Sequence, residues 1–312
     1  MSEIRFLENT YLSADGVTRV HYCVWSPVDV APIGIIQLSH GMCEYVKRYD
    51  AWARRFCEAG FIFCGNDHLG HGNTAPDEAG LGYTAPRGGA MLLVEDCHTL
   101  TQLMREQYPE LPLVLYGHSM GSFVARLYLT KYGDALSAAI ISGTGGPGSP
   151  AALARSITHL IAALRGDRHR SKLLTAVAFG GFNKRFQEEN SALSWLSRDA
   201  ETRKGYGADV FCRYIFTAAG YDTLFSLLQA VSRRDWAERV PKHLPMLLIS
   251  GDADPVGNYG KGVKTVYERL LAAGCTRTAL KLYKGARHEP HNELNRDEVY
   301  ADLIDFIKGA LQ

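Results

Sequence analysis

Residues 113–122 constrain the fold of this chain more than any other stretch, because they predict a buried strand that turns directly into a helix. The stretch opens with the apolar run of a buried strand, and the apolar residues after Gly121 recur at helical spacing. The turn between them reads Gly-x-Ser-x-Gly. So sharp a turn brings neighbouring backbone very close, and glycine at Gly117 and Gly121 removes the Cβ atoms that would clash. We therefore expect Ser119 at the apex, in a strained conformation, with its hydroxyl above the sheet.

Strands and helices alternate along most of the chain. Two strands around a turn at 14–16 predict an N-terminal hairpin. Apart from the stretch at 113–122, the sequence predicts strands at 4–12, 17–25, 33–39, 61–64, 138–142, 245–250 and 279–283, and helices at about 49–58, 89–107, 260–273 and 296–310. This alternation predicts an α/β protein with an eight-stranded, mostly parallel sheet that carries helices on both faces.

The alternation breaks once, in the middle of the chain. A loop at 143–150 is rich in Gly, Pro, Ser and Thr, and residues 151–236 show helical patterns without a convincing strand. An insertion between strands of such a sheet lies at their carboxyl ends, where ligands bind. The sequence therefore predicts a core made of residues 1–146 and 237–312, with residues 147–236 inserted as a helical cap, or lid.

Composition and charge exclude several classes of protein. The 312 residues carry a formal net charge of +1, which gives no general attraction to nucleic acid. No apolar run reaches the length of a membrane-spanning helix, and the first residues lack a secretory signal pattern. The seven cysteines form no C-x-x-C pair, so we expect mostly buried free thiols in a reducing compartment. These features predict a cytoplasmic protein with no nucleic-acid partner.

A serine hydroxyl becomes a strong nucleophile only when a base takes its proton, and the base needs an acid that orients it. After a strand–turn–helix of this kind, the acid and then the histidine follow the serine along the chain. The loop after the strand at 245–250 supplies Asp252 and Asp254. We expect Asp254 to be the acid, because it lies deeper in the loop and is fixed by Pro255, whereas Asp252 could instead cap the turn.

The candidate base should follow the last strand, and the segment there contains His288 and His291. His288 is closer to the strand and better placed to reach over the sheet edge, so we expect it to be the base. His291 is expected to help start the final helix or to lie on its surface.

The negative charge that develops on a substrate oxygen needs preorganised N–H donors. One donor should be the backbone N–H of Met120, the residue after the serine, and the other should come from the loop that follows the strand at 33–39. In that loop His40 and Gly41 lead into Met42, and glycine lets the backbone turn the next N–H inward. We therefore predict an oxyanion hole formed by the backbone N–H groups of Met42 and Met120.

The loop at 66–72 places Asp67, His68 and His71 close together, which raises the question of a metal site. Their spacing fits no common zinc pattern, so we expect a structural loop that supports the oxyanion side. The chain also lacks the glycine patterns of dinucleotide-binding and P-loop proteins. The sequence therefore predicts neither a metal nor a cofactor.

Together these motifs resemble the monoacylglycerol lipase and bacterial lysophospholipase group of α/β hydrolases. The resemblance spans nearly the whole chain and rests on His40-Gly41-x-x-Glu44-x-x-x-Arg48-Tyr49, Asn66-Asp67-His68-x-Gly70-His71-Gly72, Gly117-His118-Ser119-Met120-Gly121, Gly251-Asp252-Ala253-Asp254-Pro255-Val256 with His288, and residues 194–199. It implies an α/β-hydrolase fold and a serine carboxylic ester hydrolase that acts on single-acyl lipids, monoacylglycerol or lysophospholipid, through an acyl-enzyme. The implied triad is Ser119, Asp254 and His288, with Met42 and Met120 as the oxyanion hole.

The predicted cap offers a surface for lipid. One face of its first helix carries the apolar residues Leu153, Ile157, Leu160, Ile161 and Leu164. We expect about half of them to pack on the core and the others to meet an acyl chain. A basic run follows, formed by Arg165, Arg168, Arg170 and Lys172. This run is expected to meet anionic lipid head groups, which predicts peripheral contact of the cap with a membrane or micelle surface.

Two other functions stay open on the sequence alone. A peptidase or aminopeptidase-like amide hydrolase of the same fold would need a charged site for a peptide terminus. A catalytically silent binding protein would usually lack one member of the triad, and here all three can be placed. Ser119 argues against the epoxide hydrolases and dehalogenases of this fold, because they use aspartate at that position.

Overall fold

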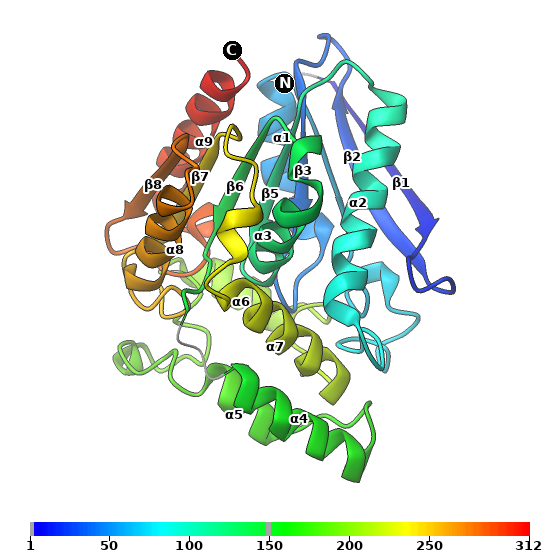
Figure 1. The fold of residues 1–312 in the computed structure, drawn as a ribbon, viewed down its shortest axis with the longest axis vertical. Helices are drawn as coiled ribbons and strands as arrows, with labels where there is room; N and C mark the ends of the chain where they lie inside the picture. The colour runs from blue at the N-terminus through cyan, green and yellow to red at the C-terminus, as the bar shows by residue number, and fades with distance from the viewer. Residues whose placement is uncertain (1–2, 148–150) are drawn as a thin grey trace.

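The computed structural model describes residues 3–147 and 151–312, and a sheet of eight strands runs through them. The strands are β1 (Ile4–Leu12), β2 (Arg19–Pro27), β3 (Gly34–Ser39), β4 (Phe61–Asn66), β5 (Leu113–His118), β6 (Ala138–Ser142), β7 (Met246–Gly251) and β8 (Thr278–Tyr283). Their order across the sheet is β1-β2-β4-β3-β5-β6-β7-β8 (Figure 1). β2 pairs antiparallel with β1 and β4, and every other pair is parallel. The predicted α/β architecture is therefore confirmed.

Helices cover both faces of this sheet. The α-helices of the described residues are α1 (Asp50–Glu58), α2 (Gly89–Gln107), α3 (Met120–Tyr132), α4 (Ala151–Arg165), α5 (Lys172–Phe179), α6 (Ala200–Ala208), α7 (Ala218–Ser232), α8 (Lys261–Ala272) and α9 (Arg296–Ala310), and five of them pack on the sheet. α1 and α9 cover one face, and α2, α3 and α8 cover the other (Figure 1). Neighbouring strand residues point to opposite faces, so Ile35 joins the core under α2 and α3 while Ile36 joins the core under α1 and α9. Both faces are buried, which explains the continuous apolar runs in the sequence.

Most predicted strands and helices end within two or three residues of the observed ones. β2 is an instructive difference, because it begins at Arg19 and not at residue 17. The carboxylate of Asp15 accepts hydrogen bonds from the backbone N–H groups of Val17 (2.8 Å) and Thr18 (2.7 Å) and holds both residues in the turn. A side chain that competes for backbone donors in this way delays the start of the strand.

Between β6 and β7 the described residues form helices, as the sequence predicts. α7 packs against α2 and α3, and α4 packs on α7. α4 and α5 therefore form the layer farthest from the sheet (Figure 1). The predicted loop at 143–150 is described as far as residue 147, and residues 148–150 lie outside the described part of the chain. The division of the chain into a core and a cap over 147–236 remains a prediction.

The apolar face of α4 is divided between burial and exposure. Leu153, Leu160 and Leu164 are 64%, 61% and 73% exposed. Ile157 and Ile161 are half-buried, and the helix packs on α7, which belongs to the predicted cap. The expectation that about half of this face packs on the core therefore stays a prediction.

Two further observations concern the environment of the chain. In the part of the chain that the structure describes, no helix has both the length and the apolar character needed to cross a bilayer. All seven cysteines are buried and free of disulfide bonds, as predicted, and burial raises the pKa of Cys97 to about 12. Such thiols stay protonated and poorly reactive near neutral pH.

Candidate active site

Ser119 occupies the turn between β5 and α3 with φ 53° and ψ −120°, a region that a residue with a side chain seldom adopts. The backbone N–H of Ser119 donates to the carbonyl oxygen of Ser142 (2.9 Å), which holds the turn against the end of β6. The two glycines of the motif permit this packing. A Cβ atom on Gly117 would lie 2.6 Å from the Ala125 Cβ, and one on Gly121 would lie 1.9 Å from the Ser39 carbonyl oxygen.

The structure brings the three predicted triad residues together. The Nε2 atom of His288 lies 2.7 Å from the Ser119 Oγ, and its Nδ1 atom lies 3.0 Å from the Asp254 Oδ2. Asp254 is fully buried and His288 is 2% exposed. The three residues come from the loops after β5, β7 and β8, so their contacts depend on the parallel register of the sheet.

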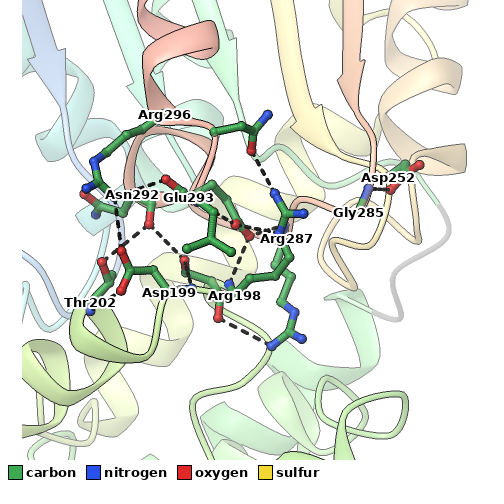
Figure 2. Close-up of polar contacts among 12 residues, drawn as sticks. Arg198, Asp199, Thr202, Asp252, Gly285, Arg287, Asn292, Glu293 and Arg296 are labelled. Carbon is green, nitrogen blue, oxygen red and sulfur yellow. Dashed lines mark hydrogen bonds and ion pairs between the residues drawn. The ribbon is translucent and has the colours of Figure 1, made fainter.

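The two candidate acids have different surroundings. Asp254 accepts hydrogen bonds from the Ser250 hydroxyl (3.1 Å) and from the Val256 N–H (2.8 Å), which fix the carboxylate next to His288. Asp252 instead accepts the backbone N–H of Gly285 at 2.7 Å and links the loops after β7 and β8 (Figure 2). Of the two carboxylates, only that of Asp254 lies against the His288 Nδ1, and Asp252 bonds to the neighbouring loop.

A glycine allows these two loops to meet. A Cβ atom on Gly251, the last residue of β7, would lie 1.9 Å from the Ala286 carbonyl oxygen. Backbone atoms cannot move aside as a flexible side chain can. The close approach of the loops that carry Asp254 and His288 therefore requires glycine at this position.

The protonation of His288 follows from its two contacts. An ionised Asp254 can only accept, so the His288 Nδ1 carries the proton and the Nε2 is free to accept the Ser119 hydroxyl proton. Burial lowers the pKa of His288, but the charge of Asp254 and its hydrogen bond outweigh burial and raise this pKa above the ordinary histidine value of 6.5. Glu289 and Glu44 raise it further.

The loop after β3 is held by His40. The His40 Nε2 accepts the backbone N–H of His68 (3.0 Å), so its Nδ1 carries the proton and donates to the Gly41 carbonyl oxygen (2.8 Å). Because C=O and N–H point in opposite directions across a trans peptide, this bond also fixes the direction of the Met42 N–H. A Cβ atom on Gly41 would lie 3.0 Å from the Ser119 Cβ, so the loop and the serine are in close contact.

Met42 and Met120, the predicted oxyanion-hole residues, both line a cavity with Ser119. Met120 is the first residue of α3, and the first N–H groups of a helix have no partner within that helix. Each of these two N–H groups therefore belongs to backbone that is fixed beside the serine.

The loop at 66–72 is buried and hydrogen-bonded as a support. Asp67 accepts the backbone N–H groups of Val46 (2.7 Å) and Asn73 (2.8 Å), and its Oδ2 lies 2.9 Å from the His21 Nδ1. His68 holds His40 through its backbone N–H, as described above. Burial lowers the pKa of His68 to about 3 and that of His71 to about 4, so both are neutral at physiological pH.

One group of potential metal ligands exists elsewhere among the described residues. Glu8, His21 and Cys23 bring one ligand atom each within 4.8 Å of one another. The ammonium of Lys47 lies 2.8 Å from the same Glu8 oxygen that approaches His21, and burial raises the pKa of the Cys23 thiol. A cation would have to displace Lys47 and deprotonate a buried thiol, so we assign no metal to this group.

Three charged residues to which the sequence analysis gave no role, Glu44, Arg48 and Glu289, lie directly behind the site. The Arg48 guanidinium bridges Glu44 (2.9 Å) and Glu289 (2.7 Å), and all three side chains are largely buried. Burial raises the pKa of Glu44, whereas Arg48 overcomes burial and lowers that of Glu289. The sequence hints at two of these residues, because Glu44 and Arg48 lie four residues apart in the motif at 40–49, and at the third by its place beside the candidate base. The pairing of Arg48 with Glu289 has no local signal, because 241 residues separate them.

His291 differs from its prediction. It lies in a short 3₁₀ helix before α9 and is 1% exposed, so it neither begins that helix nor lies on its surface. Its ring stacks on Tyr49 with centroids 4.8 Å apart and meets the edge of Trp52. These rings and that of His118, whose centroid lies 4.7 Å away, surround His291, and burial lowers its pKa to about 3.

Two cavities meet at Ser119. One, of about 270 Å³, is lined mainly by apolar side chains, among them Phe123, Phe179, Phe182, Leu224, Phe225 and Leu228. The other, of about 290 Å³, is also lined largely by apolar side chains, but polar groups lie on its wall, and we call it the mixed cavity; these groups belong to Glu44, His118, Tyr206, Arg213 and Glu289. A substrate that reaches the serine therefore meets apolar side chains in both cavities and charged groups in one of them.

Known proteins resemble this chain in sequence and in fold. The family model described as serine aminopeptidase, S33, matches residues 30–295. The monoacylglycerol lipase of Mycolicibacterium smegmatis is 30% identical over 97% of this chain and 98% of its own length, and the monoglyceride lipase of Homo sapiens is 29% identical over 91% and 84%. A thermostable carboxyl esterase from Bacillus coagulans, solved with glycerol, has a TM-score of 0.92 and 33% identity, and the match covers 98% of this chain and 99% of that one.

The hydrogen bonds among Ser119, His288 and Asp254 predict that these side chains act as a unit. Ser119→Ala and His288→Ala should each lower kcat on an aryl ester by about 10⁴- to 10⁶-fold, and the double variant should lose little more. Asp254→Asn should be severely impaired, because an amide cannot stabilise a protonated His288. Asp252→Asn is the matched control and should stay close to wild type. A greater loss in Asp252→Asn than in Asp254→Asn would contradict this assignment of the acid.

The raised pKa of His288 predicts the pH dependence of hydrolysis. The base must be neutral, so kcat/KM should rise with pH through one ionisation and be lost below it. Because Asp254 stabilises the protonated ring, the midpoint should lie above the ordinary value of 6.5. A profile measured from pH 5 to pH 9 with a rate-limiting chemical step tests this expectation, and a flat profile over that range would argue against a histidine base.

Proposed function

The chain belongs to the serine aminopeptidase S33 family of α/β hydrolases, and on this premise we propose that it hydrolyses esters of single-acyl lipids through an acyl-enzyme on Ser119. The relatives that match over nearly their whole length are ester hydrolases by name, a monoacylglycerol lipase and a carboxyl esterase among them. The chain is accordingly a carboxylic ester hydrolase.

Chemistry in the proposed cycle starts at the 2.7 Å contact between Ser119 and His288. The His288 Nε2 takes the hydroxyl proton while the Ser119 Oγ bonds to the ester carbonyl carbon. The resulting tetrahedral oxyanion accepts hydrogen bonds from the backbone N–H groups of Met42 and Met120. His288 then gives its proton to the departing alkoxide, which leaves the acyl group on Ser119. A water molecule, deprotonated by His288, attacks the carbonyl carbon of this acyl-enzyme. The bond from that carbon to the Ser119 Oγ then breaks, His288 returns its proton to the Oγ, and the carboxylic acid leaves.

One observation carries the choice of substrate: two largely apolar cavities meet at the same serine, and only one of them, the mixed cavity, also carries charged groups and tyrosine hydroxyls on its wall. An acyl chain in the apolar cavity would gain about 0.8 kcal/mol for each methylene removed from water. The alcohol part would then face the mixed cavity, where tyrosine hydroxyls and charged groups can accept and donate hydrogen bonds. A single-chain lipid with a small polar alcohol fits both cavities. Because Arg213 lines the mixed cavity, we propose a lysophospholipid as well as a monoacylglycerol.

An amide hydrolase that recognises a free α-amino group would need a carboxylate in the mixed cavity without a cationic partner. Glu44 and Glu289 line this cavity, and both share the single guanidinium of Arg48. Burial also raises the pKa of Glu44, which disfavours its charged form. This pairing favours an ester substrate with a neutral or zwitterionic alcohol over an aminoacyl amide.

We propose residues 147–236 as the cap that closes the apolar cavity. α7 supplies Leu224, Phe225 and Leu228 to the cavity wall, and α5 supplies Val177 and Phe179. The outer surface of α4 and α5 carries exposed leucines, including Leu160 and Leu164 on α4 and Leu173 on α5. A lipid or micelle surface is the partner that we propose for this apolar face.

The basic run after α4 contributes less to such contact than its charge implies. Arg170 donates to the carbonyl oxygens of Leu81 (2.8 Å) and Ala79 (3.0 Å) and to that of Ile215, so it joins the cap to the core. Arg168 lies over the ring of Tyr83 at 3.8 Å. Arg165 and Lys172 are exposed and are the residues of the run that we propose to face anionic head groups.

A hydrolysis panel tests the substrate. Purified wild-type protein should cleave long-chain monoacylglycerol or lysophospholipid with a higher kcat/KM than a short aryl acetate, because the apolar cavity contributes only with a chain. Ser119→Ala is the control for contaminating hydrolases, and an aminoacyl amide is the alternative substrate. Faster cleavage of the amide than of every lipid ester would overturn the proposal.

A charge on α4 tests the lipid-facing surface. Leu160→Asp should lower kcat/KM on a long-chain monoacyl substrate about tenfold more than on a short aryl acetate, because a carboxylate weakens apolar contact with the lipid surface. The matched control is Leu12→Asp, since Leu12 is 51% exposed on β1, outside the cap. Thermal melts check folding. Equal loss on both substrates would mean that this face does not meet lipid.

A further inference from the structure

A stretch of the predicted cap is bound to the loop that carries His288. We call residues 194–199 the anchor segment. Between the end of β8 at Tyr283 and the 3₁₀ helix that begins at Pro290, the histidine loop has no regular structure of its own. Its buried N–H groups therefore need partners from elsewhere. The His288 N–H donates to the Trp195 carbonyl oxygen (3.3 Å), and the Glu289 N–H donates to that of Leu196 (2.9 Å).

Glu293 joins the two stretches through a carboxylate that is fully buried. Its Oε1 accepts the backbone N–H of Arg287 (2.8 Å), one residue before His288, and that of Arg198 (3.1 Å) in the anchor segment. Its Oε2 accepts the Arg198 Nε (2.8 Å) and the Leu294 N–H (3.1 Å). Figure 2 shows Glu293 between Arg198 and Arg287. Four donors satisfy the buried charge, and two of them come from the predicted cap.

Further contacts hold the anchor segment in the same place. Arg287 forms a two-point ion pair with Glu189 and also donates to the Ser194 carbonyl oxygen (2.5 Å). The ring of Trp195 lies 5.0 Å from that of His288. The anchor segment thus contacts the histidine loop in three ways. Its carbonyl oxygens accept backbone N–H groups of the loop, the Trp195 ring packs on the His288 ring, and the Ser194 carbonyl oxygen accepts a hydrogen bond from Arg287.

We propose that Glu293 is a positioning residue for ester hydrolysis, which places His288 by binding the anchor segment to the histidine loop. This inference rests on the proposed role of His288 as the base. Glu293 itself touches neither the serine nor either cavity. It acts through the peptide groups on both sides of His288, and small displacements of a catalytic group from its working geometry can cost about 100-fold in rate.

Glu293→Gln tests the inference with almost no change in shape. The amide nitrogen would face the Arg198 Nε or the Leu294 N–H, so a donor would meet a donor. We expect kcat on a short aryl acetate to fall about 10- to 100-fold with KM little changed. The acid limb of kcat/KM should also move to lower pH, because a displaced His288 loses part of the stabilisation that Asp254 gives its charged form. A purely structural role would lower Tm without moving this limb.

Arg296→Gln is the matched control. The Arg296 guanidinium pairs with Asp199 at 3.1 Å and joins the same two stretches of chain at the exposed rim, where Arg296 is 49% exposed (Figure 2). It lies eight residues beyond His288. We expect its kcat and its acid limb to match wild type. A loss in this control equal to that of Glu293→Gln would overturn the inference.

Removal of a buried carboxylate could prevent folding, so Arg198→Met provides a second route. This variant leaves Glu293 with its three backbone N–H donors but removes the guanidinium from the anchor segment. We expect a smaller fall in kcat, about three- to tenfold, with the same direction of shift in the acid limb. Wild-type kcat and an unmoved limb in both folded variants would overturn the inference.

The short aryl acetate keeps this test separate from the proposed lipid substrate, because it does not need the apolar cavity. If wild-type protein hydrolyses the acetate but no lipid ester, the proposed function fails while the comparison of Glu293→Gln with Arg296→Gln still decides the role of Glu293.

Discussion

The contact of three loops at the carboxyl edge of the sheet is the constraint on which this structure depends. The serine, the acid and the histidine come from different strands, and their 2.7 Å and 3.0 Å contacts exist only while β5, β6, β7 and β8 keep their register. Backbone packs against backbone at this edge, so glycine is required at Gly121 and Gly251. Ser119 is held at a positive φ by this surrounding structure, in line with the strain that is stored at functional sites.

Charge burial is the second requirement of the site. Asp254, Glu44, Glu289 and Glu293 are all buried, and an isolated carboxylate in such a place would be very costly. Each of them accepts N–H or O–H donors; Arg48 pairs with Glu44 and Glu289, and Arg198 pairs with Glu293. These contacts leave His288 with Asp254 on one side and the serine on the other, so the ring can receive the serine proton and Asp254 stabilises the protonated form.

The sequence predicted the sheet, because strand and helix periodicity and turn glycines are local signals. It also predicted which loops would carry Ser119, Asp254 and His288, since chain order and position after a strand suffice for that. It could not predict the pairing of Arg198 with Glu293, because 95 residues separate them and neither has a local pattern. The burial of His291 and the use of Arg170 to bind core carbonyls were missed for the same reason. Long-range polar contacts depend on the folded arrangement, which periodicity does not contain.

The interlocking of residues 194–199 with the loop at 287–293 has a consequence for how such proteins diverge. An inserted domain that touched its host only at two hinges could be exchanged between relatives as a block. Here the backbone carbonyl oxygens of Trp195 and Leu196 accept hydrogen bonds from the N–H groups of His288 and Glu289. The anchor segment should therefore be inherited together with the loop at 287–293. α4 and α5 lie in the outermost layer and lack these bonds to the histidine loop. We therefore expect α4 and α5 to vary more freely among relatives than the anchor segment, which should change only together with the loop at 287–293.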